Sequence, residues 1–163
     1  MFMIRPTQKL RKRVPALVDA APSPPNTRLG DWYANLLVHH RKQVVLFVSE
    51  RTLLPVVVPA VQIATLIPRF RQALAALLEA IGIEASAIDD ELREMSEHGV
   101  GKTSNRRVLG SMNDFAWLLE AAPESETLLN AARVMADAPC SPIGMESPRA
   151  VTLALFASGG AGG

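Results

Sequence analysis

Three consecutive residues, Gly101-Lys102-Thr103, have the chemistry of a phosphate-binding site. Phosphate-binding loops of nucleotide-hydrolysing enzymes end in this triplet, because backbone amides and the lysine together bind the phosphate oxygens. The complete loop needs another glycine five residues before its second one, and this chain has Ser96 there. The preceding residues also form an acidic helical pattern rather than a buried strand. We therefore interpret 101–103 as a turn or short strand that leads into a helix.

A smaller anion site is predicted at the beginning of that helix. If the helix begins near Ser104, its first backbone amides are unpaired and carry a partial positive charge. Lys102, Arg106 and Arg107 stand beside these amides in the sequence and add three cationic side chains. The alternative is that the two arginines pair with acidic residues of the preceding helix or are solvated.

A polar pair in the middle of the same helix is a further candidate. Asn113 and Asp114 have poor helix propensity, so their place in a helical pattern indicates a special role. That role is either binding or catalysis, or a buried hydrogen bond to a neighbouring loop. Arg106, Gly110 and Trp117 lie roughly on the same side of the predicted helix, opposite its apolar stripe.

Other catalytic and metal-binding patterns are missing from the sequence. His39 and His40 are adjacent at the end of a predicted hairpin, so their side chains point to opposite faces and do not favour one shared metal ion. We interpret this pair as part of a solvated turn. A single cysteine, Cys140, allows neither an internal disulfide nor a cysteine-cluster metal site. We therefore expect no metal and no cofactor, and a hydrolase built on Asn113, Asp114 and a histidine is the least favoured function.

The strands that would position these residues lie near the start of the chain. A short apolar segment, Phe2 to Ile4, predicts a first strand. Trp32 to Val38, Gln43 to Ser49 and Leu54 to Val58 are rich in β-branched or aromatic residues and are separated by short polar breaks. This spacing predicts an antiparallel meander. The middle strand is apolar on both faces, which indicates that both faces are covered.

Helices are predicted where the apolar period changes from 2 to 3.6. The clearest helix runs from Ile63 to Ile81 and stops at Gly82, with Pro68 in its first turn. Ser86 and Asp89 have the spacing of a capping box for the next one. Further helices are predicted at about 9–18 after Thr7, from Thr103 or Ser104 onward, at about 125–136, and from Ser147-Pro148 to Phe156.

Together these elements predict an α+β fold. An antiparallel β-meander at about residues 30–59, plus an N-terminal strand, is expected to pack with four to five helices from the C-terminal two-thirds. Residues 20–26 contain three prolines and predict an irregular loop. We expect a single domain over 1–157 and a flexible glycine-rich tail over 158–163.

Length and charge narrow the class of protein. The chain has 163 residues, of which 48% are hydrophobic, enough for one packed core. Its longest apolar stretch is too short to cross a bilayer, and the N-terminus has no secretory pattern, so we expect a cytoplasmic protein. The net charge of +1 hides a strong segregation. Residues 1–72 have 11 Lys/Arg and 3 Asp/Glu, whereas residues 73–163 have 6 and 13.

Four segments resemble a family of small bacterial proteins known as a domain of unknown function. They are Thr7 to Leu10, Arg28 to Leu36, Val48 to Pro55, and Gly101 to Phe115 with its Gly-Lys-Thr-Ser-Asn-Arg beginning. The resemblance covers roughly residues 3–120 and implies a bacterial cytosolic protein with no established activity. Asn35, Lys102, Thr103, Asn105 and Arg106 lie in the shared motifs. The candidates for binding an anion or a partner are therefore Lys102, Thr103, Asn105, Arg106, Arg107, Asn113, Asp114 and Asn35.

Two functions follow from these features. The first is a non-enzymatic module that binds a protein partner or assembles with itself, and it rests on the segregated charge and the lack of a coherent catalytic set. The second is the binding of nucleic acid or an anionic ligand through the basic N-terminal segment with Lys102, Arg106 and Arg107. Either the basic and acidic halves neutralise one another in the fold, or they form two surfaces of opposite charge.

Overall fold

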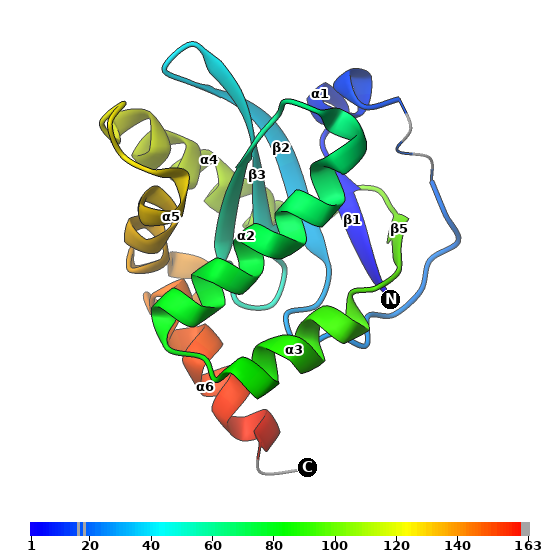
Figure 1. The fold of residues 1–163 in the computed structure, drawn as a ribbon, viewed down its shortest axis with the longest axis vertical. Coiled ribbons are helices and arrows are strands. Elements are labelled where there is room, and N and C mark those ends of the chain that lie inside the picture. The colour runs from blue at the N-terminus through cyan, green and yellow to red at the C-terminus, as the bar shows by residue number, and fades with distance from the viewer. Residues whose placement is uncertain (16, 18, 161–163) are drawn as a thin grey trace.

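The fold is a five-stranded sheet with helices on both faces (Figure 1). A computed structural model describes residues 1–15, 17 and 19–160. The strands are β1 (Phe2–Pro6), β2 (Trp32–His39), β3 (Lys42–Ser49), β4 (Pro55–Pro59) and β5 (His98–Val100). The α-helices are α1 (Gln8–Arg13), α2 (Leu66–Ile81), α3 (Ala85–Glu94), α4 (Arg106–Ala121), α5 (Leu128–Ala136) and α6 (Pro148–Gly160). Two short 3₁₀ helices, η1 (Ile63–Thr65) and η2 (Ser141–Ile143), precede α2 and α6.

The sheet has the order β4-β3-β2-β1-β5 and is mixed. Strands β2, β3 and β4 form the predicted antiparallel meander. The fold class is therefore α+β as expected, but the sheet is not purely antiparallel, because β1 pairs in parallel with both β2 and β5. A parallel pair needs a long crossover, and α1 with the proline-rich loop provides it between β1 and β2. Strand β5 was not predicted, because three residues are too few to display an alternating pattern.

Each face of the sheet has its own hydrophobic cluster. Helix α2 crosses one face, where Phe70 stacks on Phe47 with ring centroids 4.1 Å apart and meets the edge of Trp32 at 5.0 Å. Helix α4 covers the other face, where Phe115 is buried in a cluster with Tyr33. The prediction that β3 is covered on both sides is confirmed, since its successive apolar residues belong alternately to the two clusters.

Two helices begin at the predicted residues: Thr7 caps α1, and the Ser147 hydroxyl accepts a hydrogen bond from the Ala150 amide at the start of α6. Helix α4 was expected directly after Thr103 or Ser104 but begins at Arg106, with Asn105 as its cap. Thr127, which was not predicted as a cap, caps α5. The capping box is wrong: α3 begins at Ala85, one residue before Ser86, and no side chain caps it.

The ends of three helices also differ from the prediction. Helix α1 ends at Arg13, before the expected end at Val18, which lies outside the described residues. Helix α5 begins at Leu128 rather than near Ser125. Helix α6 continues to Gly160, past the expected end at Phe156. Residues 161–163 of the expected tail lie outside the described residues, and the flexibility of the tail stays a prediction.

Candidate interaction surface

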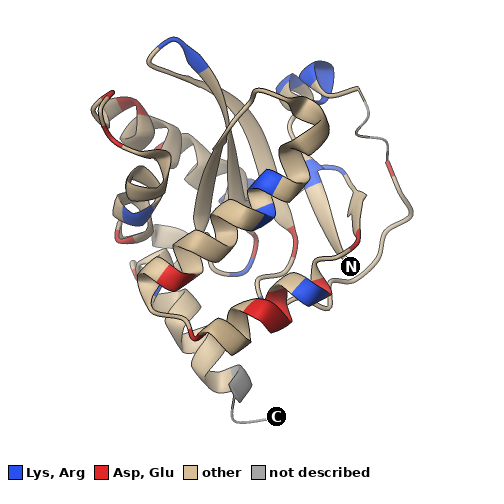
Figure 2. Ribbon diagram, viewed as in Figure 1, with Lys and Arg blue, Asp and Glu red and all other residues tan. Residues whose placement is uncertain are grey.

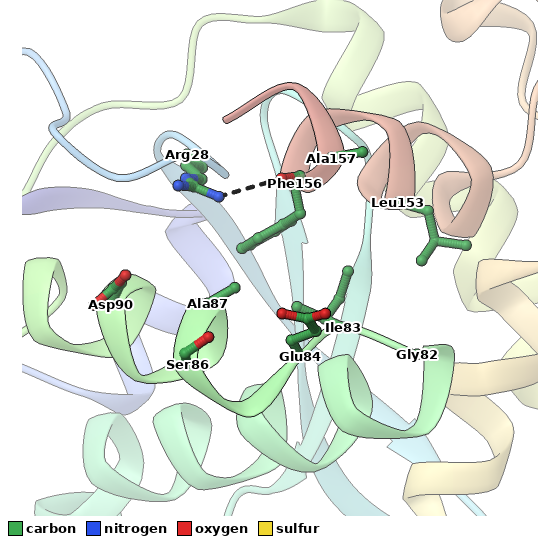
Figure 3. Close-up of a pocket in the computed structure, with 10 residues that line it drawn as sticks. All are labelled: Arg28, Gly82, Ile83, Glu84, Ser86, Ala87, Asp90, Leu153, Phe156 and Ala157. Carbon is green, nitrogen blue, oxygen red and sulfur yellow. Dashed lines mark hydrogen bonds between the residues drawn. The ribbon is translucent and has the colours of Figure 1, made fainter. Parts of the chain in front are cut away.

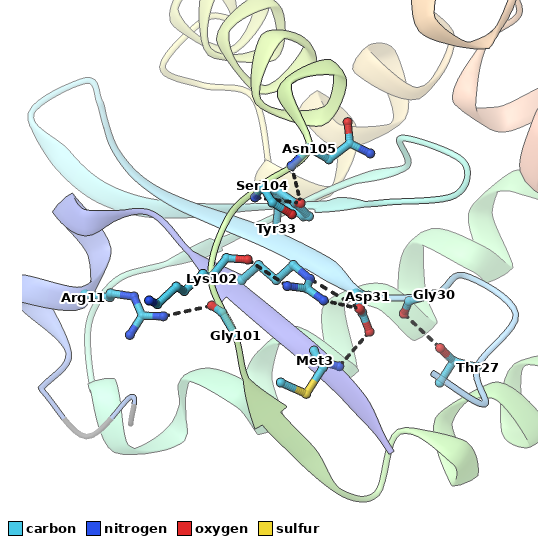
Figure 4. A network of polar contacts seen from close by, with 11 residues as sticks. Met3, Arg11, Thr27, Gly30, Asp31, Tyr33, Gly101, Lys102, Ser104 and Asn105 are labelled. Atoms are coloured by element: carbon cyan, nitrogen blue, oxygen red, sulfur yellow. Dashed lines mark hydrogen bonds and ion pairs between the residues drawn. The ribbon is translucent and has the colours of Figure 1, made fainter. Parts of the chain in front are cut away.

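The Gly101-Lys102-Thr103 segment is an irregular connection between β5 and α4, and a buried carboxylate helps to fix it. The side chain of Asp31 is 4% exposed. It accepts a hydrogen bond from the Met3 amide at 2.9 Å and forms an ion pair with Arg5 at 3.1 Å. The Arg5 guanidinium then donates to the Lys102 carbonyl at 2.8 Å (Figure 4). The connection is thereby attached to β1.

Two further contacts hold the same connection. The Arg11 guanidinium of α1 donates to the Gly101 carbonyl at 2.9 Å and pairs with Asp19 at 2.7 Å. The Tyr33 hydroxyl of β2 accepts hydrogen bonds from the Ser104 amide at 3.2 Å and the Asn105 amide at 2.8 Å (Figure 4). The basic N-terminal segment and Lys102, which were predicted to act together, therefore lie side by side.

The second and third amides of α4 already have an acceptor within the protein. The Asn105 side-chain oxygen accepts from the Arg107 amide at 3.0 Å and from the Val108 amide at 3.3 Å. The Arg107 guanidinium donates to the Pro142 carbonyl at 2.9 Å. Among the described residues, neither Arg106 nor Arg107 forms an ion pair with α3. Anion binding here stays a prediction, and an anion would have to displace the Asn105 cap.

Two other residues of the shared motifs have structural positions. Asn35 is half-buried on β2, where its side-chain oxygen accepts a hydrogen bond from the Thr7 hydroxyl at 2.7 Å. Because Thr7 caps α1, Asn35 positions the first helix. Thr103 is half-buried in the connection before α4.

Asn113 and Asp114 lie on the solvent side of α4 with Trp117, as the helical pattern predicted. Both are exposed, and Trp117 is 80% exposed. The alternative of a buried hydrogen bond for this pair is wrong, because neither side chain is buried. A pocket that contains His39 and His40 is lined by neither Asn113 nor Asp114. The geometry needed for a hydrolase built on these residues is not formed there.

No described ion pair joins the basic half of the chain to the acidic half. Four ion pairs occur within residues 1–15, 17 and 19–160, and each joins two residues of the same half of the chain. Figure 2 shows Lys and Arg on α1 and at the tip of the β2–β3 hairpin, and Asp and Glu both on α3 at the opposite end and on the α4–α5 connection near the hairpin. We call the exposed cations of α1 and the hairpin tip the basic end: Lys9, Lys12, Arg13, Arg41 and Lys42.

A second pocket, of about 450 Å³, lies between α3 and α6 (Figure 3). Arg28 lies over the Phe156 ring at 5.3 Å and donates to the Phe156 carbonyl at 3.4 Å. The buried Glu91 of α3 accepts hydrogen bonds from the Arg28 amide at 2.8 Å and the Leu29 amide at 3.0 Å. Burial raises the pKa of Glu91, and the two amides oppose this effect. These contacts fasten the loop before β2 to the helical layer.

The two adjacent histidines differ from the prediction. Their rings do not point to opposite faces, because the ring centroids of His39 and His40 lie 4.3 Å apart. His39 is 8% exposed rather than solvated, and neither of its ring nitrogens has a hydrogen-bond partner among the described residues. His40 is exposed and its Nε2 lies 2.7 Å from the Ala122 carbonyl. The period of two along β2 contained the missed signal, because it places His39 on the same face as the buried Tyr33.

In the part of the chain that the structure describes, no three His, Cys, Asp or Glu side chains come together to hold a metal ion. No helix within that part is both long and apolar enough to cross a membrane.

Comparison with curated proteins and with solved structures found no match. A family model described as a domain of unknown function, DUF6933, matches residues 3–151. The chain belongs to this DUF6933 family, in agreement with the resemblance of its motifs.

Proposed function

We propose that this domain is a protein-interaction module whose basic end binds an acidic protein surface. The proposal rests on one observation: no described ion pair joins a cation of the basic half to a carboxylate of the acidic half. The five cations of the basic end are exposed and none belongs to those ion pairs. Concentrated, unpaired charge of one sign attracts a surface of opposite sign and accelerates its association.

The position of Lys102 extends this surface. Its backbone is held by Arg5, and the neighbouring Gly101 carbonyl is held by Arg11 of α1. Figure 4 draws Lys102 beside Arg11, so its exposed ammonium adds to the cations of the first helix. The interaction surface we propose therefore runs from the hairpin tip across α1 to Lys102.

An acidic protein is favoured over nucleic acid because the basic end lacks stacking groups. Single-stranded nucleic acids are bound by cations together with exposed aromatic rings. Trp32 and Tyr33, the aromatic residues of β2, are both 0% exposed. The exposed Trp117 belongs to α4 rather than to α1 or the hairpin. The acidic surface can belong to another protein or to α3 of a second copy.

The test is a charge-reversal experiment. We would measure the self-association of the purified chain and its capture of proteins from native lysate at low and moderate salt. Lys9→Glu with Lys12→Glu and Arg41→Glu should abolish a complex that forms at low salt. Arg133→Glu, on the exposed side of α5, is the matched control and should leave it intact.

The salt dependence gives a second criterion. Exposed charges are screened over about 8 Å at physiological ionic strength, so the complex should weaken as salt rises. A protein that is monomeric at low salt and captures no acidic partner would refute the proposal. Tighter binding to labelled duplex DNA than to any acidic protein would replace it with a nucleic-acid function.

A further inference from the structure

The tip of the β2–β3 hairpin borders a pocket of about 430 Å³, and two cations of the basic end, Arg13 and Lys42, line one side of it. Its walls come from the end of α1, the hairpin, the end of β4 and the connection between α4 and α5. Val44, Pro59 and Leu128 form part of an apolar floor. This volume is in the range of pockets that hold small molecules.

His39 lines this pocket with both ring nitrogens unpaired. The ring is buried, and neither Nδ1 nor Nε2 makes a hydrogen bond to the described residues. The Leu119 carbonyl lies close enough to favour a protonated ring but completes no hydrogen bond with it. An unsatisfied buried donor or acceptor costs about 1–3 kcal/mol, so native structures seldom leave one without a partner.

The backbone places this ring at some conformational cost. His40 and Arg41, the two residues of the turn, have φ values of 48° and 68°. Tight hairpin turns with positive φ at both positions favour asparagine or glycine, and neither residue is present here. The contact between His40 Nε2 and the Ala122 carbonyl fixes the turn against the end of α4. The hairpin tip is therefore held in one position, which fixes His39 in the pocket.

Charges of both signs surround the apolar floor. Arg13 and Lys42 line the pocket from α1 and β3, while Glu124 and Glu126 line it from the α4–α5 connection. Two cations and two carboxylates leave no net charge for a simple anion or cation to neutralise. A ligand that has one positive and one negative group can pair with the two carboxylates and with the two cations. If the ligand also has an apolar part, that part covers the apolar floor of the pocket.

We propose that this pocket binds a small zwitterion with an apolar body, of the size of an aliphatic α-amino acid. The carboxylate of the ligand pairs with the cations from α1 and β3, and its ammonium pairs with the carboxylates of the α4–α5 connection. The His39 ring completes its hydrogen bonds on the same ligand. A neutral imidazole suits this role, because it has one donor and one acceptor.

The experiment titrates the wild-type chain with three probes and follows the His39 ring by NMR. The chain has three histidines, and the His39→Asn variant assigns the signal. The probes are L-leucine, isocaproate, which lacks the ammonium, and isoamylamine, which lacks the carboxylate. We expect L-leucine to move the His39 signal saturably and to bind at least about tenfold more tightly than either partial probe.

Two variants test the charge pairing. Glu124→Gln should remove much of the preference for L-leucine over isocaproate, whereas Glu79→Gln, on the exposed side of α2, should leave it unchanged. Equal or tighter binding of isocaproate by the wild type would identify a simple anion site and overturn the proposal. A His39 signal that no probe moves at millimolar concentration would overturn it too, with water as the occupant. The interaction test above uses Lys9, Lys12 and Arg41, which do not line this pocket, so the two proposals fail separately.

Discussion

Replacing Glu91 tests how the helical layer is fastened to the sheet. The Glu91 carboxylate is the acceptor for two consecutive backbone amides, at 2.8 and 3.0 Å. In Glu91→Ala both amides lose their acceptor inside the protein, and each loss costs about 1–3 kcal/mol. The Arg28 amide is only partly buried, so we expect a total loss of about 3 kcal/mol in the free energy of unfolding. Glu91→Gln keeps one acceptor oxygen and should lose about 1–2 kcal/mol.

The pH dependence of the Gln variant separates the two effects that act on Glu91. Burial raises its pKa above the ordinary 4.5, so the folded state holds its proton more tightly than the unfolded state. The stability from this group is therefore complete below pH 4.5 and is lost as pH rises through the folded pKa. As pH rises, the wild type loses this contribution to the free energy of unfolding because Glu91 is deprotonated, whereas the glutamine of Glu91→Gln does not titrate. The deficit of Glu91→Gln should therefore narrow as pH rises.

Urea unfolding followed by circular dichroism measures both effects, with Asp89→Asn on the same helix as the control. Asp89 is exposed, and its replacement should change stability by less than about 0.5 kcal/mol. A loss for Glu91→Ala no greater than that of the control would refute the assigned role of the carboxylate. A deficit of Glu91→Gln that widens with pH would show that the two amides outweigh burial.

Three other predictions follow from the polar contacts. Asn105→Ala removes the cap of α4 and should lower stability by about 1 kcal/mol in thermal unfolding, and an unchanged midpoint would contradict the cap. Asp31→Ala leaves the Met3 amide and Arg5 without their acceptor and should cost about 3 kcal/mol, while Asp31→Asn should cost less. Burial and His40 lower the pKa of His39 below 6.5, so its stability contribution is complete above pH 6.5 and is lost as pH falls through the folded pKa. His39→Asn should therefore flatten the fall in urea midpoint below pH 6.5, and an unchanged slope would contradict the burial of the ring.

Local patterns predicted most of the elements because local physics determines them. The meander follows from β-branched runs, and α2 follows from an apolar stripe that ends at Gly82, where φ is 102°. Thr7 was predicted to precede α1 and does cap it. Each of these features depends on a few neighbouring residues, so a single sequence contains the necessary information.

Features that depend on distant partners were predicted less well. The parallel pairing of β1 with β5 joins residues more than ninety positions apart, such as Phe2 and His98, and no local pattern encodes it. The Tyr33 hydroxyl and the Asn105 side chain take up the amides that sequence reasoning left available for an anion. For His39, the period of two along β2 indicated the buried face, but the end of α4 that lies against the hairpin tip is a tertiary property that no local pattern encodes.

The charge segregation shows how a local sequence property becomes a surface property. The four ion pairs of the described residues join partners at most 26 positions apart, as in Arg5 with Asp31, so they neutralise charge within each half and not between halves. Helix α1 and the hairpin tip stand at one end, and α3 stands at the other (Figure 2). Although the net charge of the chain is only +1, the exposed cations of α1 and the hairpin tip attract an acidic partner over distances of about a Debye length. Such a distribution favours orientation of a partner over general attraction, which is why reversing Lys9 and Lys12 should weaken binding more than an equal change at Arg133.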